Sequence, residues 1–194
     1  MKLKETLLKR RRIYTGKSLD FSADIVLLPN GKRALREYAE HPSAVAVVPF
    51  IEKNTFKFHG LNDLLKQRII LVRQFRFPIG KITYEIPAGK LDRAVKETPE
   101  DCVRREIEEE TGYYAKSIKK LISYWPAPAF STEMLHIFAA YDMKKTGKLP
   151  DKDEFLETHI AKFGDVLRLI QKNKIRDSKT IISLLFLYYL VSTT

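Results

Sequence analysis

The sequence predicts an α/β protein in which helices cover both faces of a mixed β-sheet, preceded by an antiparallel β appendage. Two continuous apolar runs carry this prediction: AVAVVPF, from Ala44 to Phe50, and IILVRQF, from Ile69 to Phe75. Such runs are typical of strands that are buried on both faces of a sheet. Helical patterns follow them along the chain, so helices are available to cover the sheet.

The composition is that of a globular protein with one sizeable core. The 194 residues are 44% hydrophobic and 30% charged, which is ordinary for such proteins. The one cysteine, Cys102, cannot form an intrachain disulfide, and we therefore expect a cytoplasmic protein. The longest apolar run, Ile181 to Val191, is shorter than the ~20 residues of a membrane-spanning helix and is expected to be a buried helix.

The formal net charge of +11 has two interpretations. A basic surface can bind nucleic acid, or it can be a solvated, lysine-rich exterior that attracts small anions. The dense basic cluster Lys9–Arg12 is not interleaved with aromatic residues, as a base-stacking platform would be. We therefore favour a small anionic ligand and expect neither nucleic acid nor a membrane as partner.

The first part of the chain is expected to form antiparallel strands. RIYTGKSLDFSADIVLLP and KRALREYAE have strand patterns, and Asn30-Gly31 between them is typical of a hairpin turn. His41-Pro42 then interrupts the pattern. We accordingly divide the chain into an N-terminal β segment, residues 1–43, and a main domain, residues 44–194.

Further along, strand gives way to helix at a marked boundary. ITYEIPAGKLD begins as an extended segment and is broken by Pro87 and Gly89. Thr98 can cap a helix, Pro99 suits its first position, and Gly112 supplies its end. Further strands are expected at SIKKLISYW and MLHIFAAYDM, and two more helices at DVLRLIQKN and SKTIISLLFLYYL.

Four carboxylates crowd into little more than one turn of this helix, in the stretch REIEEE. Like charges three or four residues apart repel by roughly 0.2–0.5 kcal/mol for each pair. At 100° per residue, Glu106, Glu109 and Glu110 span an arc of ~100° beside the positions that face the core, Val103 and Ile107. The spacing alone favours a solvated acidic face, which is common on exposed helices.

The same three carboxylates would also suit a magnesium ion, because Mg²⁺ prefers hard oxygen ligands and would offset the repulsion. The turn Pro87-Ala88-Gly89 lies next to the helix in sequence. We expect its backbone carbonyls to be free of regular pairing, so that the Ala88 carbonyl is a candidate further ligand.

The segment from Gly89 to Tyr113, GKLDRAVKETPEDCVRREIEEETGY, resembles the Nudix hydrolase signature. That signature is a glycine, five residues, a glutamate, seven residues and R-E-U-x-E-E-x-G-U, where U is aliphatic or aromatic. The ending REIEEETGY matches every fixed position, and seven residues separate Glu97 from Arg105. One departure is that seven residues, not five, separate Gly89 from Glu97.

The flanking stretches resemble the ADP-ribose pyrophosphatases of this family. VRQFRFPIGKITYEIPAGKLD is similar to the stretch before their signature, and REYAEHPSAVAVVPF to their N-terminal region. Pro128 lies fifteen residues after Tyr113, where this subfamily has a proline. KLPDKDEFLE is similar to its acidic catalytic loop, and IRDSKTIISLLFLYYL to its last helix. The resemblance covers nearly the whole chain and implies the Nudix α/β/α sandwich.

By this resemblance, the reaction is hydrolysis of the pyrophosphate bond of a nucleoside diphosphate sugar. The first candidate substrate is ADP-ribose, which would give AMP and ribose 5-phosphate. The implied cofactor is Mg²⁺, with Mn²⁺ as the alternative, because such ions neutralise the phosphate oxygens and lower the pKa of a bound water. The expected metal ligands are Glu106, Glu109, Glu110 and the Ala88 carbonyl.

The resemblance also assigns catalytic roles. A glutamate on the acidic loop of this subfamily helps to activate water, and Glu154 is our prediction for that general base. Asp153 is the alternative, and Lys152 stands where relatives often have glutamate. We count Glu109 and Arg105 among the catalytic residues, and Glu109 also among the metal ligands.

Three assignments concern charged residues around the metal face. Arg105 is expected to point away from the acidic arc and to orient the loop, by pairing with Glu97 or with groups on the side of Glu108. Arg76 is the candidate phosphate or ribose contact, and Glu85 a partner that holds Arg76 or the substrate. The alternative for Arg76 and for Glu85 is an ordinary surface ion pair.

The N-terminal segment is expected to contribute to a dimer. Relatives often take the aromatic partner of adenine from an N-terminal segment that two subunits exchange, and Tyr14 and Phe21 are the candidates here. We therefore expect a homodimer.

Glu133 is predicted to be a supporting loop carboxylate at the substrate, with a surface ion pair as an equal alternative.

Two other functions remain open. The first is a Nudix hydrolase with another substrate, such as a different nucleotide sugar, a dinucleotide polyphosphate or an RNA 5′ end. The second is a non-catalytic Nudix-fold module that binds a nucleotide, a regulator or RNA through Lys9–Arg12. The three intact glutamates of the signature count against the second function, because a binding module has no need of them.

Overall fold

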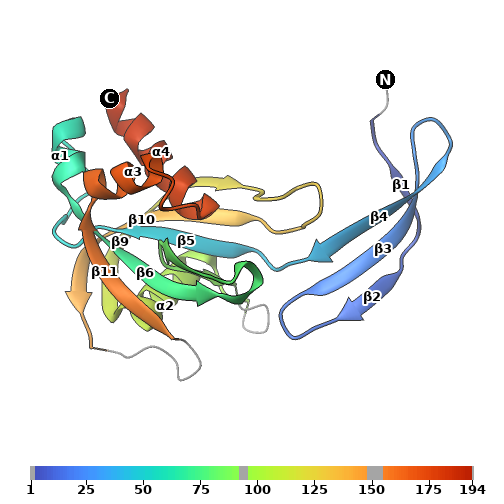
Figure 1. Cartoon of the computed structure of the whole chain (residues 1–194), viewed down its shortest axis with the longest axis horizontal. Helices are drawn as coiled ribbons and strands as arrows, with labels where there is room; N and C mark the ends of the chain where they lie inside the picture. Colours follow the sequence, from blue (N-terminus) through green and yellow to red (C-terminus); the bar gives the residue numbers. More distant parts are fainter. Residues whose placement is uncertain (1–2, 92–95, 148–154, 194) are drawn as a thin grey trace. The chain divides into compact units, whose positions relative to one another are not determined.

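A computed structural model of the chain describes residues 3–91, 96–147 and 155–193 (Figure 1). The chain divides into two compact units. The first unit contains Met1–Ser43 and Tyr124–Met134, and the second contains Ala44–Ser123 and Leu135–Thr194. The break after Ser43 coincides with the boundary placed on the sequence, whereas Tyr124–Met134, assigned there to the main domain, groups with the first unit.

The first unit is built on an antiparallel sheet, as predicted. Its strands are β1 (Thr6–Lys9), β2 (Arg12–Thr15), β3 (Asp20–Leu27) and β4 (Arg33–Glu40). β4 pairs along the whole of β3, while β1 and β2 pair with successive stretches of the opposite edge of β3. The predicted turn at Asn30-Gly31 is confirmed: the Leu28 N–H donates to the Lys32 carbonyl at 2.8 Å, and Gly31 has a φ of 80°.

The second unit contains two sheets. The mixed sheet has the order β8 (Ala88–Lys90), β5 (Ala44–Pro49), β10 (Leu135–Lys145) and β9 (Tyr113–Tyr124), with β5 parallel to β10 and antiparallel to β8. The other sheet is antiparallel, with the order β11 (Leu156–Lys162), β6 (Arg68–Arg76) and β7 (Lys81–Glu85). The predicted mixed sheet is thus confirmed, but the apolar run of β6 belongs to a separate sheet.

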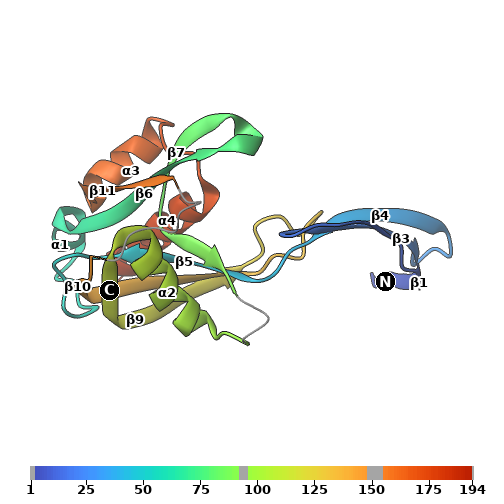
Figure 2. The same cartoon turned by 90° about the horizontal axis from the view of Figure 1, so that it is seen from below.

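Four α-helices and one short 3₁₀ helix complete the second unit in the described residues. They are α1 (Leu61–Lys66), η1 (Phe77–Ile79), α2 (Pro99–Thr111), α3 (Phe163–Gln171) and α4 (Ser178–Ser192). α2 and α4 both pack on β5, and Figure 2 shows them on opposite sides of that strand. The helix-covered arrangement predicted from the sequence is therefore present.

The core explains this layering. Every residue of β5 is buried, so the strand needs cover on both faces, as its apolar run predicted. Val45 and Val47 belong to the cluster that contains Val103 and Ile107 of α2. Side chains alternate along a strand, so Ala44, Ala46 and Val48 face the opposite side. The rotation of α2 is fixed by this packing, and the helix therefore presents its acidic arc in a defined direction.

The last helix is less buried than its apolar sequence predicted. Leu184 and Leu187 of α4 are fully buried, but Leu185 is 48% exposed and Tyr189 is 60% exposed. α4 therefore buries one face only. Among the residues that the structure describes, no helix combines the length and the apolarity that crossing a membrane requires.

Candidate functional site

α2 begins and ends where local sequence signals place it. The Thr98 side chain accepts a hydrogen bond from the Asp101 N–H at 3.2 Å, Pro99 is the first helical residue, and Gly112 ends the helix at a φ of 69°. Glu106 and Glu110 lie on the flank beside the core face and are only 8% and 5% exposed. The alternative of a solvated acidic face is therefore wrong for these two carboxylates.

Gly89 allows the Glu106 carboxylate to lie directly over β8. A Cβ atom placed on Gly89 would be 1.8 Å from Oε1 of Glu106, far inside van der Waals contact. Any other residue at this position would push the carboxylate away from the strand. The glycine thus permits a close approach of backbone and side chain and does not serve a turn.

Ala88 presents its backbone polar groups to the same helix. The Val47 N–H donates to the Pro87 carbonyl at 2.9 Å, and Ala88 stands opposite Ala46 in the next pair of the antiparallel register. That pair is non-hydrogen-bonded, so the N–H and carbonyl of Ala88 point away from β5. The Ala88 N–H instead donates to Glu110 at 3.0 Å. The expectation of free carbonyls is therefore wrong for Pro87, and the register leaves the Ala88 carbonyl outside the ladder.

Arg105 lies among the carboxylates and does not point away from them. Its Nε and Nη2 donate to the two oxygens of Glu97 at 2.8 and 3.0 Å, which confirms the predicted pair. Its Nη1 also donates to Glu106 at 2.7 Å and to Glu109 at 3.0 Å, which corrects the expected direction. The hydrogen bonds to Glu97 are the main cause of a pKa of Arg105 above its usual value.

The donor set around Gly89 fits a hard divalent cation. It offers three carboxylates and one backbone carbonyl, the oxygen ligands that Mg²⁺ uses together with water and phosphate. In the described part of the chain, no three His, Cys, Asp or Glu side chains already have metal-binding geometry. The reason is visible in the contacts: Arg105 and the Ala88 N–H now occupy carboxylate oxygens that an ion would take.

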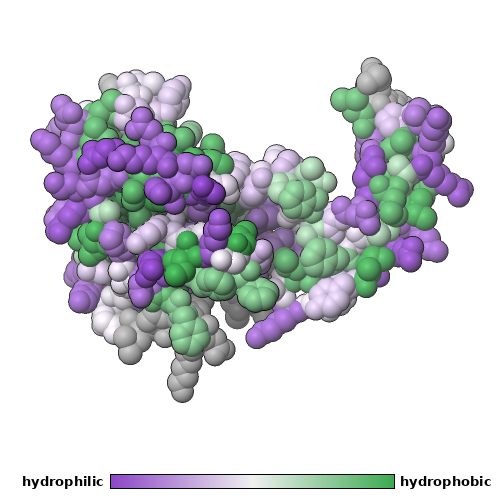
Figure 3. All heavy atoms as spheres, in the orientation of Figure 1, coloured by the Kyte–Doolittle hydropathy of each residue, from purple (hydrophilic) through white to green (hydrophobic). Residues whose placement is uncertain are grey.

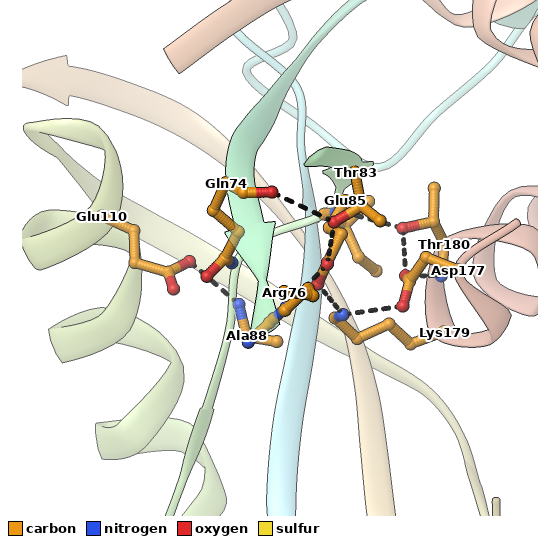
Figure 4. A network of polar contacts seen from close by, with 10 residues as sticks. Gln74, Arg76, Thr83, Glu85, Ala88, Glu110, Asp177, Lys179 and Thr180 are labelled. Carbon is orange, nitrogen blue, oxygen red and sulfur yellow. Dashed lines mark hydrogen bonds and ion pairs between the residues drawn. The ribbon is translucent and has the colours of Figure 1, made fainter. Parts of the chain in front are cut away.

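Arg76 and Glu85 form the second charged element of the site (Figure 4). Arg76 donates from Nε and Nη2 to the two oxygens of Glu85 at 2.8 and 2.6 Å, which confirms that Glu85 holds Arg76. Burial alone would raise the pKa of Glu85, but the hydrogen bonds from Arg76 and the charge of Lys179 lower it to about 2. Glu85 is therefore a buried anion at neutral pH.

Four other predicted residues cannot be placed at this site. Glu154 lies outside the described residues. Glu133 belongs to the first unit, where a carboxylate oxygen lies 3.6 Å from Nδ1 of His41. Tyr14 and Phe21 also lie in the first unit, with ring centroids 6.3 Å apart.

Sequence reasoning missed several contacts. Lys179 and Asp177, at the start of α4, join the Glu85 network, and no local signal links them to a strand more than ninety residues away. Cys102 also makes a contact that no local signal reveals. Its Sγ donates to the Lys90 carbonyl at 3.4 Å, and burial raises the pKa of its thiol.

A family model described as NUDIX domain matches residues 61–184. The chain belongs to the Nudix family. An ADP-ribose pyrophosphatase from Bacillus subtilis (strain 168) is 35% identical over 95% of this chain and 93% of that protein. A methanol dehydrogenase activator from Bacillus methanolicus is 35% identical over 94% of this chain and 92% of that protein.

Two further comparisons concern substrate class and fold. A GDP-mannose pyrophosphatase from Yersinia enterocolitica is 35% identical over 65% of this chain and 71% of that protein. A crystal structure of an ADP compounds hydrolase aligns with a TM-score of 0.79 over 98% of this chain and 95% of that chain, at 19% identity. This similarity confirms the Nudix fold predicted from the sequence.

Proposed function

We propose that this protein is a Mg²⁺-dependent pyrophosphohydrolase of nucleoside diphosphate sugars. Its preferred substrate would be ADP-ribose, cleaved to AMP and ribose 5-phosphate. The observation that carries this proposal is the convergence of the Glu106 and Glu110 carboxylates on the Ala88-Gly89 backbone in a Nudix chain. ADP-ribose is favoured over GDP-mannose because the similarity to the ADP-ribose pyrophosphatase spans 95% of this chain, against 65% for the GDP-mannose enzyme.

The residues of α2 and β8 would hold the ion, through Glu106, Glu109, Glu110 and the Ala88 carbonyl. When bound, Mg²⁺ neutralises the diphosphate oxygens and lowers the pKa of a water molecule. Arg105 keeps its two bonds to Glu97 when the carboxylates turn to the ion, and so orients the segment before α2. Nη1 of Arg76 makes no hydrogen bond within the described residues, which leaves it for the diphosphate.

Glu154 is proposed as the general base that takes a proton from the attacking water. We expect Glu154→Gln to lower kcat by roughly 10²–10⁴-fold, the usual contribution of a positioned base. Glu157→Gln is a matched control, because Glu157 is exposed and pairs with Arg73. Near-wild-type turnover of Glu154→Gln, together with an inactive Glu110→Gln, would exclude Glu154 as the base.

The substrate is tested by incubating the protein with a panel of nucleoside diphosphate sugars and Mg²⁺ or Mn²⁺. Phosphorus NMR resolves the products. AMP formed chiefly from ADP-ribose supports the proposal, whereas faster cleavage of GDP-mannose or a dinucleotide polyphosphate would reassign the substrate. Binding without metal-dependent turnover, with an affinity that falls steeply with salt, would indicate a non-catalytic module.

We also propose a cytoplasmic homodimer. The first unit exposes many apolar side chains (Figure 3), among them Leu7, Leu8, Ile13, Tyr14, Phe21 and Leu35. Exposed apolar groups of this density are typical of surfaces that a partner covers. Light scattering should give about twice the chain mass of 22.5 kDa, and a monomer would refute the dimer. The free, buried Cys102 is compatible with a reducing compartment.

A further inference from the structure

The N-terminus of α4 reaches the pair formed by Arg76 and Glu85 (Figure 4). Nζ of Lys179 contacts Oε2 of Glu85 and donates to Oδ1 of Asp177 at 2.9 Å. Asp177 in turn caps α4, because its Oδ2 accepts from the Thr180 N–H at 3.0 Å. Glu85 therefore connects an arginine of β6 to the first turn of the last helix.

The Glu85 carboxylate has no accepting capacity left. Oε1 accepts from Nε of Arg76 at 2.8 Å and from the Thr83 hydroxyl at 2.5 Å. Oε2 accepts from Nη2 of Arg76 at 2.6 Å and from Lys179. Four donors fill the four lone-pair positions of a carboxylate. Since Glu85 is also only 2% exposed, its orientation is fixed, and the plane of the bidentate Arg76 guanidinium is fixed with it.

The charges of four side chains alternate in this network, and Arg76 is the one nearest to Ala88 and Glu110 (Figure 4). Cation and anion alternate from Arg76 through Glu85 and Lys179 to Asp177. A guanidinium paired with one carboxylate alone is a neutral unit with little remaining attraction for an anion. Lys179 shares the charge of Glu85, while Asp177 lies at the positive end of the α4 dipole, which favours its negative charge.

We propose that Lys179 is a positioning residue for substrate binding. By sharing the Glu85 carboxylate, Lys179 holds Arg76 in the orientation needed to bind the diphosphate of the substrate. This inference rests on the proposed function, in which Arg76 binds substrate. It goes further by assigning a role to the start of α4, which does not itself contact the diphosphate.

The first test separates binding from chemistry. Lys179→Met should raise KM for ADP-ribose roughly tenfold, the usual effect of losing one hydrogen bond to a charged group, with kcat changed less than about threefold. Lys179→Arg should restore KM, because it keeps the donor and the charge. Lys174→Met is the control for a lost surface charge, since Lys174 is exposed. An unchanged KM in Lys179→Met, or an equal rise in Lys174→Met, would overturn the inference.

A double-mutant cycle tests whether Lys179 acts through Arg76. In the Arg76→Met background, Lys179→Met should change kcat/KM by less than about twofold, because the effect needs the arginine. A purely structural role of Lys179 predicts instead that the two losses multiply. Multiplying losses would therefore overturn the inference.

An NMR measurement that needs no turnover tests the role of Lys179 separately from the proposed function. In ¹⁵N NMR, the Nε–H resonance of Arg76, assigned by its absence in Arg76→Met, should be protected from exchange in the wild type and in Lys179→Arg. We expect that protection to be lost in Lys179→Met. If the wild type cleaves none of the sugars, the proposed function fails, while this resonance still decides the role of Lys179. Unchanged protection in Lys179→Met would overturn it.

Discussion

Two groups of charged side chains in the second unit differ in their balance of charge. The α2 cluster consists of Glu97, Glu106, Glu109 and Glu110 with Arg105. The Glu85 cluster consists of Glu85 and Asp177 with Arg76 and Lys179. In the described residues, the α2 cluster thus places four carboxylates around one bonded guanidinium, whereas the Glu85 cluster has two groups of each sign.

The difference in charge balance gives the α2 cluster and the Glu85 cluster different roles, although both consist of carboxylates and cationic side chains. Buried charges must be compensated, because leaving them unpaired costs several kcal/mol. The Glu85 cluster compensates itself and can fix an arginine without help from an ion. The α2 cluster instead offers carboxylate oxygens of the kind that a divalent cation binds.

Removing one carboxylate from the α2 cluster should have the largest effect. We expect Glu110→Gln to lower kcat for ADP-ribose at least about a hundredfold, because a bound ion contributes several kcal/mol to catalysis. Glu108→Gln is the matched control, since Glu108 lies on the same helix outside the cluster. Turnover is measured at saturating Mg²⁺. Equal activity of the two variants would show that the α2 cluster does not hold the catalytic ion.

The second-largest effect should come from acid, which protonates Glu85 and so removes the ion pairs of the Glu85 cluster. The pKa of Glu85 is about 2 in the folded protein, below its ordinary value of 4.5. Ionised Glu85 therefore stabilises the fold above pH 4.5, by about 3 kcal/mol, and this contribution is lost as the pH falls from 4.5 to 2. Urea unfolding between pH 7 and pH 2 should show a smaller pH dependence for Glu85→Gln than for the wild type. The same pH dependence in both proteins would contradict the assignment.

Gly89→Ala should have a smaller effect, limited to the α2 cluster. The added methyl group would force the Glu106 carboxylate off β8. We expect the affinity for Mg²⁺ to fall roughly tenfold to hundredfold, the usual effect of disturbing the support of a metal ligand. Isothermal titration calorimetry measures the affinity. Wild-type affinity in Gly89→Ala would remove Glu106 from the ligand set.

Features that depend on neighbours in sequence were predicted well. α2 has its cap at Thr98 and its end at Gly112, because both signals act within one helical turn. The turn at Asn30-Gly31 and the burial of β5 have equally local causes. The carboxylates of α2 were also predicted, because the spacing of the Nudix signature that contains them is itself a local pattern.

Features that depend on distant contacts were not predicted. Nothing near Lys179 indicates that it meets Glu85, because the two are brought together only by the packing of α4. The apolar run of β6 indicated a buried strand but not which sheet it would join. Arg105 was expected to point away from the acids. This expectation was wrong because the position of a residue around the helix says little about where a long, flexible side chain ends.

The burial of Cys102 makes the natural chain a convenient parent for site-specific labelling. Its Sγ lies within the interior and its thiol stays protonated at neutral pH, so maleimide reagents should not react with it. A cysteine introduced on the exposed surface of the first unit would then be the reactive thiol. Fluorophores attached there could report whether two chains associate in solution.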